Sequence, residues 1–406
     1  MSFRIGIGGC GQFARCFVPL FKAHPDVSGV CVADALPARA DEFAQRFGVE
    51  AVDDFETMLG SSVDAVAIMT QRWTHAPMAI RAMQAGKHVY SAVPAATTVD
   101  EMSALVATVT ETGRTYMLGE TSYYYPATVW CRQRFGEGAF GDFVYGEGEY
   151  LHDMSHGFYE AFQYSGGERW KRDAGYPPML YPTHSVSIVL SVTGARVTDV
   201  ACFGIRDRHE DGVFGENAND WDNPFSNQSA LMRTSDGGVL RVNEFRRVGY
   251  SRGRSVRLSL LGTRGSFEEQ AGSAVFTTLD HNREDLTNTL ACTKVEVHDA
   301  MDPAIHEALR DDFEAGFAKA HAQERGRLPD SFRGMPNGHE GSHQFLVDDF
   351  CRAVTTGTLP PNHVWAAARY NLPGIVAHES SLSHGKTLAV PDLGWPESTP
   401  SNARSN

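Results

Sequence analysis

The sequence lacks two features that would assign it to common classes of protein. It has no excess of positive charge, because 36 lysines and arginines stand against 50 aspartates and glutamates, for a net charge of −14. A protein that binds nucleic acid through the phosphates needs a basic face, so we expect no nucleic-acid partner. No apolar run approaches the roughly 20 residues that cross a bilayer, so we expect no membrane partner.

Cysteine is scarce and its spacing is irregular. The seven cysteines are scattered, and no two are separated as in C-x-x-C. The sequence therefore predicts free thiols in a reducing compartment rather than disulfides or a zinc cluster. The N-terminal residues enter an apolar strand at once, without the regions of a secretory signal, which favours a cytoplasmic protein.

Short apolar strands alternate with amphipathic helices over residues 3–120. The expected strands are 3–8, 27–33, 63–69, 88–91 and 115–118, and the expected helices are 12–23, 37–47, 76–85 and 100–112. This alternation predicts right-handed crossovers and a parallel sheet. We therefore expect a protein of the α/β class, with an N-terminal Rossmann dinucleotide-binding domain at residues 1–120.

The rest of the chain changes character, because expected strands follow one another, at 143–150, 197–205, 230–234, 239–244 and 256–261. This pattern predicts a C-terminal α/β domain at residues 121–406, with a large, mostly antiparallel open sheet. The helical segment at about 342–380 can pack back on the first domain. The polar stretches 207–227 and 302–339 are either functional loops or insertions.

A glycine-rich turn follows the first strand in two overlapping registers. Residues 6–11 fit G-x-G-x-x-G, and residues 9–14 fit G-x-G-x-x-A. We prefer the second register, because it leaves a strand of normal length. Small residues let the backbone approach a pyrophosphate, and a helix N-terminus stabilises its charge. Asp34 ends the second strand, where a carboxylate binds ribose hydroxyls and repels a 2′-phosphate, which favours NAD. The alternative for Asp34 is a strand-end turn residue.

The segment Gly86 to Pro94, with sequence G-K-H-V-Y-S-A-V-P, closely resembles G-K-H-V-x-x-E-K-P of the Gfo/Idh/MocA family. The resemblance implies a nicotinamide-dependent protein of a group that acts mostly on sugars and cyclitols. In the family's dehydrogenases the lysine lies at the nicotinamide and moves the proton of the reacting hydroxyl. Here Val93 takes that place and Ala92 replaces the glutamate, and valine has no ionisable group. The chain is therefore expected to hold a dinucleotide without the usual lysine.

A second segment, T-Q-R-W-T-H at residues 70–75, matches T-P-x-x-x-H of the same family. The resemblance implies that His75 lines the nicotinamide ribose, and a surface histidine at a helix start is the alternative. The residues assigned to NAD are Gly9, Gly11, Gln12, Phe13, Asp34, Thr70, Trp73, His75, Val93 and Pro94.

Further motifs narrow the resemblance. Valine in place of the lysine, Y-x-H-D at 150–153, L-Y-P-T-H at 180–184 and S-H-Q-F-L-V-D-D-F at 342–350 look like glycoside hydrolase family 109 and close relatives. Those proteins are NAD-dependent glycosidases on the Gfo/Idh/MocA scaffold. Ordinary family dehydrogenases carry an aspartate four residues before the catalytic histidine, where this chain has Leu180. Both proton-handling supports of a dehydrogenase are therefore missing together.

The resemblance implies a glycosidase that oxidises carbon 3 of the sugar transiently, eliminates the aglycone, adds water and re-reduces the sugar without net redox change. It carries the active-site set over to Glu120, Tyr150, His184 and Tyr250. We assign His184 to the carbon-3 hydroxyl proton and Tyr150 to acid–base work at carbons 1 and 2. Glu120 and Tyr250 are expected to bind hydroxyls or tune neighbours.

Each of these residues also has a structural interpretation. Tyr150 can be a half-buried strand aromatic, and His152 with Asp153 can be a structural pair. His184 can lie beside a helix N-cap, and Glu120 can cap a helix or pair with Arg132 or Arg134.

The substrate is expected to be a small-molecule glycoside that also contacts His152, Trp170, Lys171 and Arg172. The basic run at 169–172 can grip an anionic sugar, or it can be a solvated loop. No metal site is expected, because His152 and Asp153 lack a second pair of ligands at metal-site spacing.

Two other functions stay open. One is an NAD-dependent sugar dehydrogenase on the same scaffold, and the other is a catalytically silent dinucleotide-binding regulator. The open sheet further predicts a homodimer or homotetramer.

Overall fold

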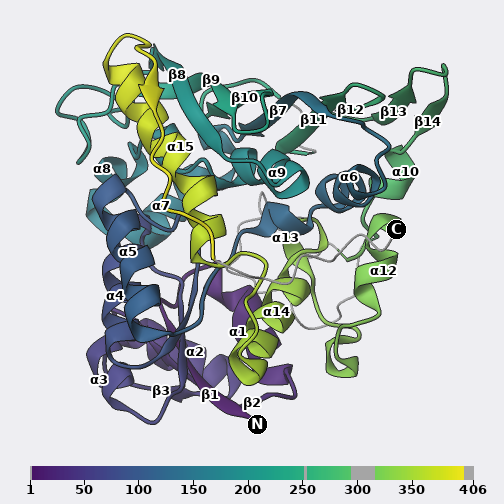
Figure 1. Ribbon diagram of the computed structural model, residues 1–406. Helices are drawn as coiled ribbons and strands as arrows, with labels where there is room; N and C mark the ends of the chain where they lie inside the picture. The colour runs from purple at the N-terminus through teal and green to yellow at the C-terminus, as the bar shows by residue number, and fades with distance from the viewer. Residues whose placement is uncertain (1, 251–253, 294–315, 397–406) are drawn as a thin grey trace.

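The computed structural model describes residues 2–250, 254–293 and 316–396 of the 406-residue chain. Part of the expected polar stretch 302–339 therefore lies outside the described residues. Two β-sheets lie at opposite ends of the molecule, with helices packed between and around them (Figure 1).

The first sheet contains the strands β1 (Phe3–Gly8), β2 (Val27–Ala33), β3 (Glu50–Ala51), β4 (Ala65–Ile68), β5 (His88–Ser91) and β6 (Tyr116–Leu118). The strands are parallel and lie in the order β3-β2-β1-β4-β5-β6. This is the order of doubly wound dinucleotide-binding domains, in which the ligand crevice opens where the order reverses, beside β1 and β4. The predicted Rossmann fold is confirmed.

Five helices connect these strands: α1 (Ala14–Ala23), α2 (Pro37–Phe47), α3 (Phe55–Gly60), α4 (His75–Gln84) and α5 (Val99–Thr112). The sequence did not predict β3 and α3, because two and six residues are too few to show a period. Helix α14 (His343–Thr356) comes from the far end of the chain and packs on α1. Its Phe350 contacts the rings of Phe3, Phe21 and Tyr90, so a C-terminal segment completes the core of the first sheet.

The second sheet contains the strands β7 (Phe143–Leu151), β8 (Val197–Arg206), β9 (Phe225–Thr234), β10 (Val239–Phe245), β11 (Val256–Gly262), β12 (Gly265–Glu269), β13 (Ala274–Thr278), β14 (Arg283–Asp285) and β15 (Leu388–Ala389). Their order is β14-β13-β12-β11-β7-β10-β9-β8-β15, and only β7 and β10 pair in parallel. The predicted large, mostly antiparallel sheet is confirmed.

The expected loop 207–227 extends too far, because its last three residues belong to a strand. Strand β9 begins at Phe225, and its polar start pairs with β8 all the way to Arg206. Polar residues hid this strand, because a composition signal cannot show cross-strand hydrogen bonds.

The remaining helices are α6 (Pro126–Gly136), α7 (Tyr159–Gly166), α8 (Trp170–Ala174), α9 (Thr183–Thr193), α10 (Thr287–Leu290), α12 (Ala322–Arg325), α13 (Gly338–Gly341) and α15 (Val364–Leu382). Helix α9 lies directly on β7, and α15 contacts both β8 and α5, so it joins the two halves of the molecule. None of the helices in the described ranges has the length and hydropathy of a membrane span.

Glycines on β7 let α9 approach this closely. A methyl group at Gly148 would lie 1.8 Å from the carbonyl oxygen of Ser185, and one at Gly146 would lie 2.9 Å from the Val189 side chain. No Cβ tolerates 1.8 Å to a backbone oxygen, so glycine is required at Gly148. This contact places the first turn of α9 against the carboxyl end of β7.

Candidate active site

The dinucleotide loop begins at Gly9, directly after β1. Gly9 has a φ of +95°, and a Cβ there would lie 2.6 Å from the carbonyl oxygen of Met69. Helix α1 then begins at Ala14, which is fully buried. Strand β1 runs through Gly8, so the structure agrees with the register G-x-G-x-x-A over residues 9–14.

The residues present fit a dinucleotide. A Cβ at Gly11 would meet no atom within 4 Å, so the backbone there is open to a ligand. Asp34 accepts hydrogen bonds from the backbone N–H groups of Cys10 and Leu36, both at 2.8 Å. Its carboxylate therefore ties the glycine loop to the end of β2. The ring of Phe13 packs on Phe17, at 4.7 Å between centroids, and Gln12 lies beside it in the turn before α1.

The other expected cofactor residues lie after β4 and β5. The His75 ring is 1% exposed, with its nitrogens 3.1 Å from the Thr70 carbonyl oxygen and 2.8 Å from that of Pro94. The surface alternative for His75 is therefore wrong. Burial lowers the pKa of His75 to about 4, so the ring is neutral and its single N–H donates to one of these two carbonyl oxygens. Val93 is 7% exposed and has no polar side-chain atom. Trp73 packs against Trp221, at 5.2 Å between ring centroids.

A buried acid–base pair joins the end of the first sheet to α9. The Nδ1 of His184 lies 2.6 Å from Oε1 of Glu120, and the same oxygen accepts a hydrogen bond from the Ser122 amide. Burial opposes the charge of Glu120, but the pairing with His184 and the hydrogen bonds outweigh it and hold its pKa below the ordinary value. The ionised carboxylate fixes the proton on Nδ1, which leaves Nε2 as the nitrogen that can accept a proton.

A second pair lies at the end of β7. The Tyr150 hydroxyl is 2.8 Å from Nδ1 of His152, whose Nε2 is 2.9 Å from the carbonyl oxygen of His156. Since that carbonyl can only accept, Nε2 carries the proton and Nδ1 accepts from Tyr150. Burial raises the pKa of Tyr150 well above its ordinary value and lowers that of His152 to about 3. The rings of Tyr150 and His184 are in contact, at 5.3 Å between centroids.

The structure adds an ion pair that the sequence analysis missed. Glu244 on β10 is the register partner of Tyr150 and lies 2.8 Å from the Arg246 guanidinium. It also accepts a hydrogen bond from Ser185 of α9. Burial raises the pKa of Glu244 to about 7, against the lowering effect of Arg246 and Ser185. The sequence feature that could have pointed to Glu244 is a charged residue at a buried position of an otherwise apolar strand.

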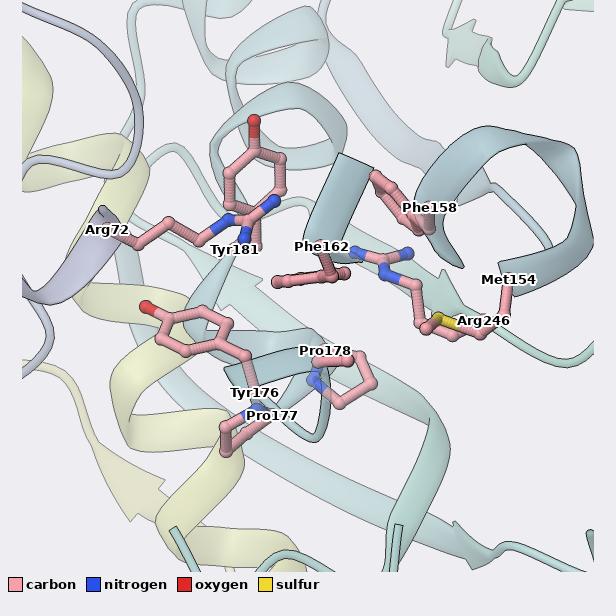
Figure 2. Close-up of a pocket in the computed structure, with 10 residues that line it drawn as sticks. Arg72, Met154, Phe158, Phe162, Tyr176, Pro177, Pro178, Tyr181 and Arg246 are labelled. Atoms are coloured by element: carbon pink, nitrogen blue, oxygen red, sulfur yellow. The ribbon is translucent and has the colours of Figure 1, made fainter. Parts of the chain in front are cut away.

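A cavity opens among side chains of α7, α8 and the segments that follow β7 and β10. Figure 2 shows the side chains that line it. It is lined by Arg72, Met154, Phe158, Phe162, Ala174, Tyr176, Pro177, Pro178, Tyr181 and Arg246. The Arg246 guanidinium lies over the Tyr150 ring, 4.6 Å from its centroid. The Tyr181 ring lies 5.3 Å from the His184 ring and 6.2 Å from the Tyr150 ring. Tyr181 is therefore a missed site residue, and its signal was its place three residues before His184.

Several expected residues lie away from this cavity. Tyr250 is half-buried, its ring contacts His156, and its hydroxyl acts electrostatically on Tyr150 without lining the cavity. Trp170, Lys171 and Arg172 lie on α8 and do not line the cavity.

The basic run at 169–172 forms ion pairs with a nearby aspartate. Arg169 and Arg172 are 68% and 49% exposed, and both pair with Asp220. The structure thus places this run at the surface. In the described part of the chain, no three His, Cys, Asp or Glu side chains gather as a metal ion would need.

Comparison with known proteins connects this arrangement to a family. Residues 3–120 match the Gfo/Idh/MocA model, an oxidoreductase family with an NAD-binding Rossmann fold. A glycosyl hydrolase family 109 protein of Saccharopolyspora erythraea is 35% identical over 202 residues, which cover 46% of this chain and 43% of that protein. Another, from Streptomyces niveus, is 25% identical over 98% of this chain and 79% of its own length. The first match thus spans less than half of that relative.

Solved structures share the fold along nearly the whole chain. Levoglucosan dehydrogenase, solved in complex with NADH and levoglucosan, has a TM-score of 0.70 and 19% identity, with 96% of this chain and 100% of that chain covered. The likeness covers both sheets and shows a common architecture. Over residues 3–120 this chain is therefore similar to the NAD-binding Rossmann domains of the Gfo/Idh/MocA oxidoreductase family.

Proposed function

We propose that this protein is an NAD-dependent glycosidase. It oxidises carbon 3 of a bound sugar transiently, eliminates the aglycone, adds water and re-reduces the sugar, so that no net redox change occurs. The observation that carries this proposal is the meeting of two acid–base pairs, Glu120–His184 and Tyr150–His152, in a chain that has valine at position 93. A simple alcohol dehydrogenase needs one proton acceptor, whereas elimination and hydration need further acid–base groups.

His184 suits the carbon-3 hydroxyl. Its Nδ1 is held by Glu120, so Nε2 accepts the hydroxyl proton when the carbon is oxidised and returns it on reduction. When bound, NAD supplies the site that takes up and returns the hydride. Asp34 and the glycine loop favour NAD over NADP, because a carboxylate repels a 2′-phosphate.

Tyr150 is the group we assign to carbons 1 and 2. Its raised pKa keeps the hydroxyl protonated, so it can donate to the departing aglycone oxygen. The Arg246 guanidinium over its ring stabilises the phenolate that this leaves, and the phenolate takes the proton from carbon 2 as the double bond forms. In the hydration the hydroxyl returns a proton to carbon 2 and takes one from the attacking water. Tyr181, between His184 and the cavity, is placed to bind a sugar hydroxyl.

The test is to incubate the protein with catalytic NAD+ and aryl α- and β-glycosides, and to follow phenol release and NADH absorbance together. We expect phenol release without NADH accumulation, and deuterium from solvent at carbon 2 of the product. NADH accumulation on free sugars without phenol release would reject the glycosidase and support the second candidate, a sugar dehydrogenase. That candidate is favoured by the fold shared with levoglucosan dehydrogenase.

We also propose that the chain self-associates through the outer face of the second sheet. Phe203, Ile205 and Leu231, on the neighbouring strands β8 and β9, are 64%, 47% and 54% exposed. They alternate with buried residues that face the helices, so they lie on the other side of the sheet. Large exposed apolar side chains on adjacent strands are typical of an interface.

A further inference from the structure

Two guanidinium groups enter the cavity beside Tyr150 from opposite sides. Arg72 comes from the loop after β4, and Arg246 comes from the end of β10, with the Phe162 ring between them (Figure 2). The two arginines differ in whether a carboxylate pairs with their positive charge. Arg246 has a buried carboxylate partner, Glu244, at 2.8 Å.

Arg72 has no such partner. Its guanidinium lies over three aromatic rings, at 4.7 Å from the centroid of Tyr181, 5.0 Å from Phe162 and 5.6 Å from Tyr176. Among the residues that the structure describes, no carboxylate lies within ion-pair distance of it, and it forms no hydrogen bond. Asp173 of α8 interacts with Arg72 electrostatically but lies beyond that distance. The cavity therefore holds one positive charge that no carboxylate of the described residues pairs with.

The apolar side chains around Arg72 strengthen its interaction with a bound anion. Phe158, Phe162 and Met154 are apolar and exclude water, which strengthens a charge-assisted hydrogen bond. The planar guanidinium presents paired N–H donors that match the oxygens of a carboxylate or sulfonate, whereas a neutral hydroxyl cannot use the charge.

The position of Arg72 shows which part of a substrate would carry the anion. Arg72 and His184 both contact the ring of Tyr181, so a group held by Arg72 lies beside the reacting part of the site. An anion at this place belongs to the sugar that reacts, because a distant aglycone group would lie farther from His184.

We propose that the sugar bound in this cavity is anionic, carrying a carboxylate or another oxyacid group that Arg72 binds. The proposal rests on the proposed function for its reaction but not for its binding. It moves recognition of the anion from the basic run at 169–172, which pairs with Asp220 outside the cavity, to a single arginine inside it.

The test is equilibrium binding of free sugars to the NAD-loaded protein by calorimetry. The ligands are four matched compounds in each of the glucose, galactose and mannose series: the neutral sugar, its uronate, its 6-sulfonate and its 6-sulfate. In at least one series we expect an anionic sugar to bind about 10- to 100-fold more tightly than the neutral one, the range for a charged hydrogen-bonded pair. The three anions distinguish a carboxylate site from a sulfonate or sulfate site.

Two variants of Arg72 and one control assign the effect. Arg72→Gln should abolish the preference for the anion, and Arg72→Lys should retain part of it, because the charge stays and the planar fork is lost. Arg169→Gln, at an exposed position of the basic run, should leave the preference unchanged. Since no carboxylate in the described ranges pairs with Arg72, its replacement leaves no described carboxylate without its partner, and thermal unfolding should verify that the variants are folded.

Equal binding of neutral and anionic sugars in all series, or an anion preference that survives in Arg72→Gln, overturns the proposal. The proposal is also overturned if Arg72→Gln lowers the affinity for NAD as much as it lowers the affinity for the anionic sugar, because Arg72 would then be a cofactor contact. If the anionic sugar binds through Arg72 but no aryl glycoside is hydrolysed, the glycosidase is wrong and the anion site stands. If neutral glycosides are hydrolysed better than their anionic counterparts, the anion site is wrong and the glycosidase stands.

Discussion

The imidazole Nδ1 of His184 and the Oε1 of Glu120 are 2.6 Å apart, in a place where both side chains are almost fully shielded from solvent. This contact joins the last strand of the first sheet to the first turn of α9, across 64 residues of sequence. It defines the tautomer of the imidazole and hence which nitrogen faces the chemistry.

Glu120→Gln should lower kcat by about 100-fold or more, because an amide can turn its NH2 toward Nδ1 and move the ring proton to Nε2. With its NH2 turned toward Nδ1, the amide no longer presents an oxygen to the Ser122 N–H at that position. Steady-state kinetics with an aryl glycoside checks this, and a kcat within threefold of the parent would contradict it.

The same substitution has a pH signature in stability. The pKa of Glu120 is below its ordinary value of 4.5, so its stabilising effect is complete above that value and is lost as the pH falls through the lower folded value. Urea unfolding should show the parent more stable than Glu120→Gln at pH 7, with the difference shrinking in acid. A difference that stays constant down to the acid limit would exclude this assignment.

Tyr150→Phe should lower kcat by about 10²- to 10⁴-fold, because it removes the proton donor at carbon 1. The ring still packs under Arg246, so the loss of stability should stay near 1 kcal/mol, the value of one hydrogen bond. Tyr145→Phe is the matched control, since Tyr145 lies on the same strand and bonds Glu147 on the outer face. Equal kinetic effects of the two substitutions would remove Tyr150 from the mechanism.

Glu244 predicts a second pH dependence, of opposite sign. Its folded pKa of about 7 exceeds the ordinary 4.5, so the stability it contributes is present below 4.5 and is lost as the pH rises through 7. The change is on the order of 3 kcal/mol, from the size of the shift. Unfolding measured between pH 4.5 and 8 should show this decline in the parent and not in Glu244→Gln.

Gly148→Ala should destabilise the protein by about 3 kcal/mol and lower activity, because the new methyl group collides with the Ser185 carbonyl and displaces α9 with His184. Gly136→Ala at the end of α6 is the control. A Cβ at Gly136 meets nothing within 4 Å, so that change should be neutral or stabilising. Thermal unfolding measures the stability of both variants. Equal stabilities of Gly148→Ala and Gly136→Ala would contradict the importance of the close packing at Gly148.

The proposed interface can be tested with Phe203→Asp and Leu231→Asp together. These changes place two charges on the outer face of the sheet and should convert an oligomer to monomer without loss of fold. Sedimentation velocity distinguishes the species. A parent that is already a monomer at micromolar concentration would rule out the interface.

The sequence predicted the parts of the fold whose cause is local. The alternation of apolar and polar residues has a period of two or 3.6, and that period reports strands and helices within one segment. The glycine turn and Asp34 follow the same logic, because a tight turn and a strand end are separated by a fixed length of chain. Tyr150 and His184 entered the candidate set differently, because the motifs at 150–153 and 180–184 resemble those of a known family.

Only the tertiary structure decided which of these residues meet. The pairing of β7 with β10 places Glu244 beside Tyr150, and Gly148 lets α9 bring His184 to the same place. Arg72 comes from the other half of the chain and enters the cavity that the basic run at 169–172 does not reach. Contacts between distant segments depend on strand register and on how closely a helix can approach a sheet. A pattern read along the chain contains neither, which is why the sequence determined the elements and the chemistry of single residues, while the structure decided their partners.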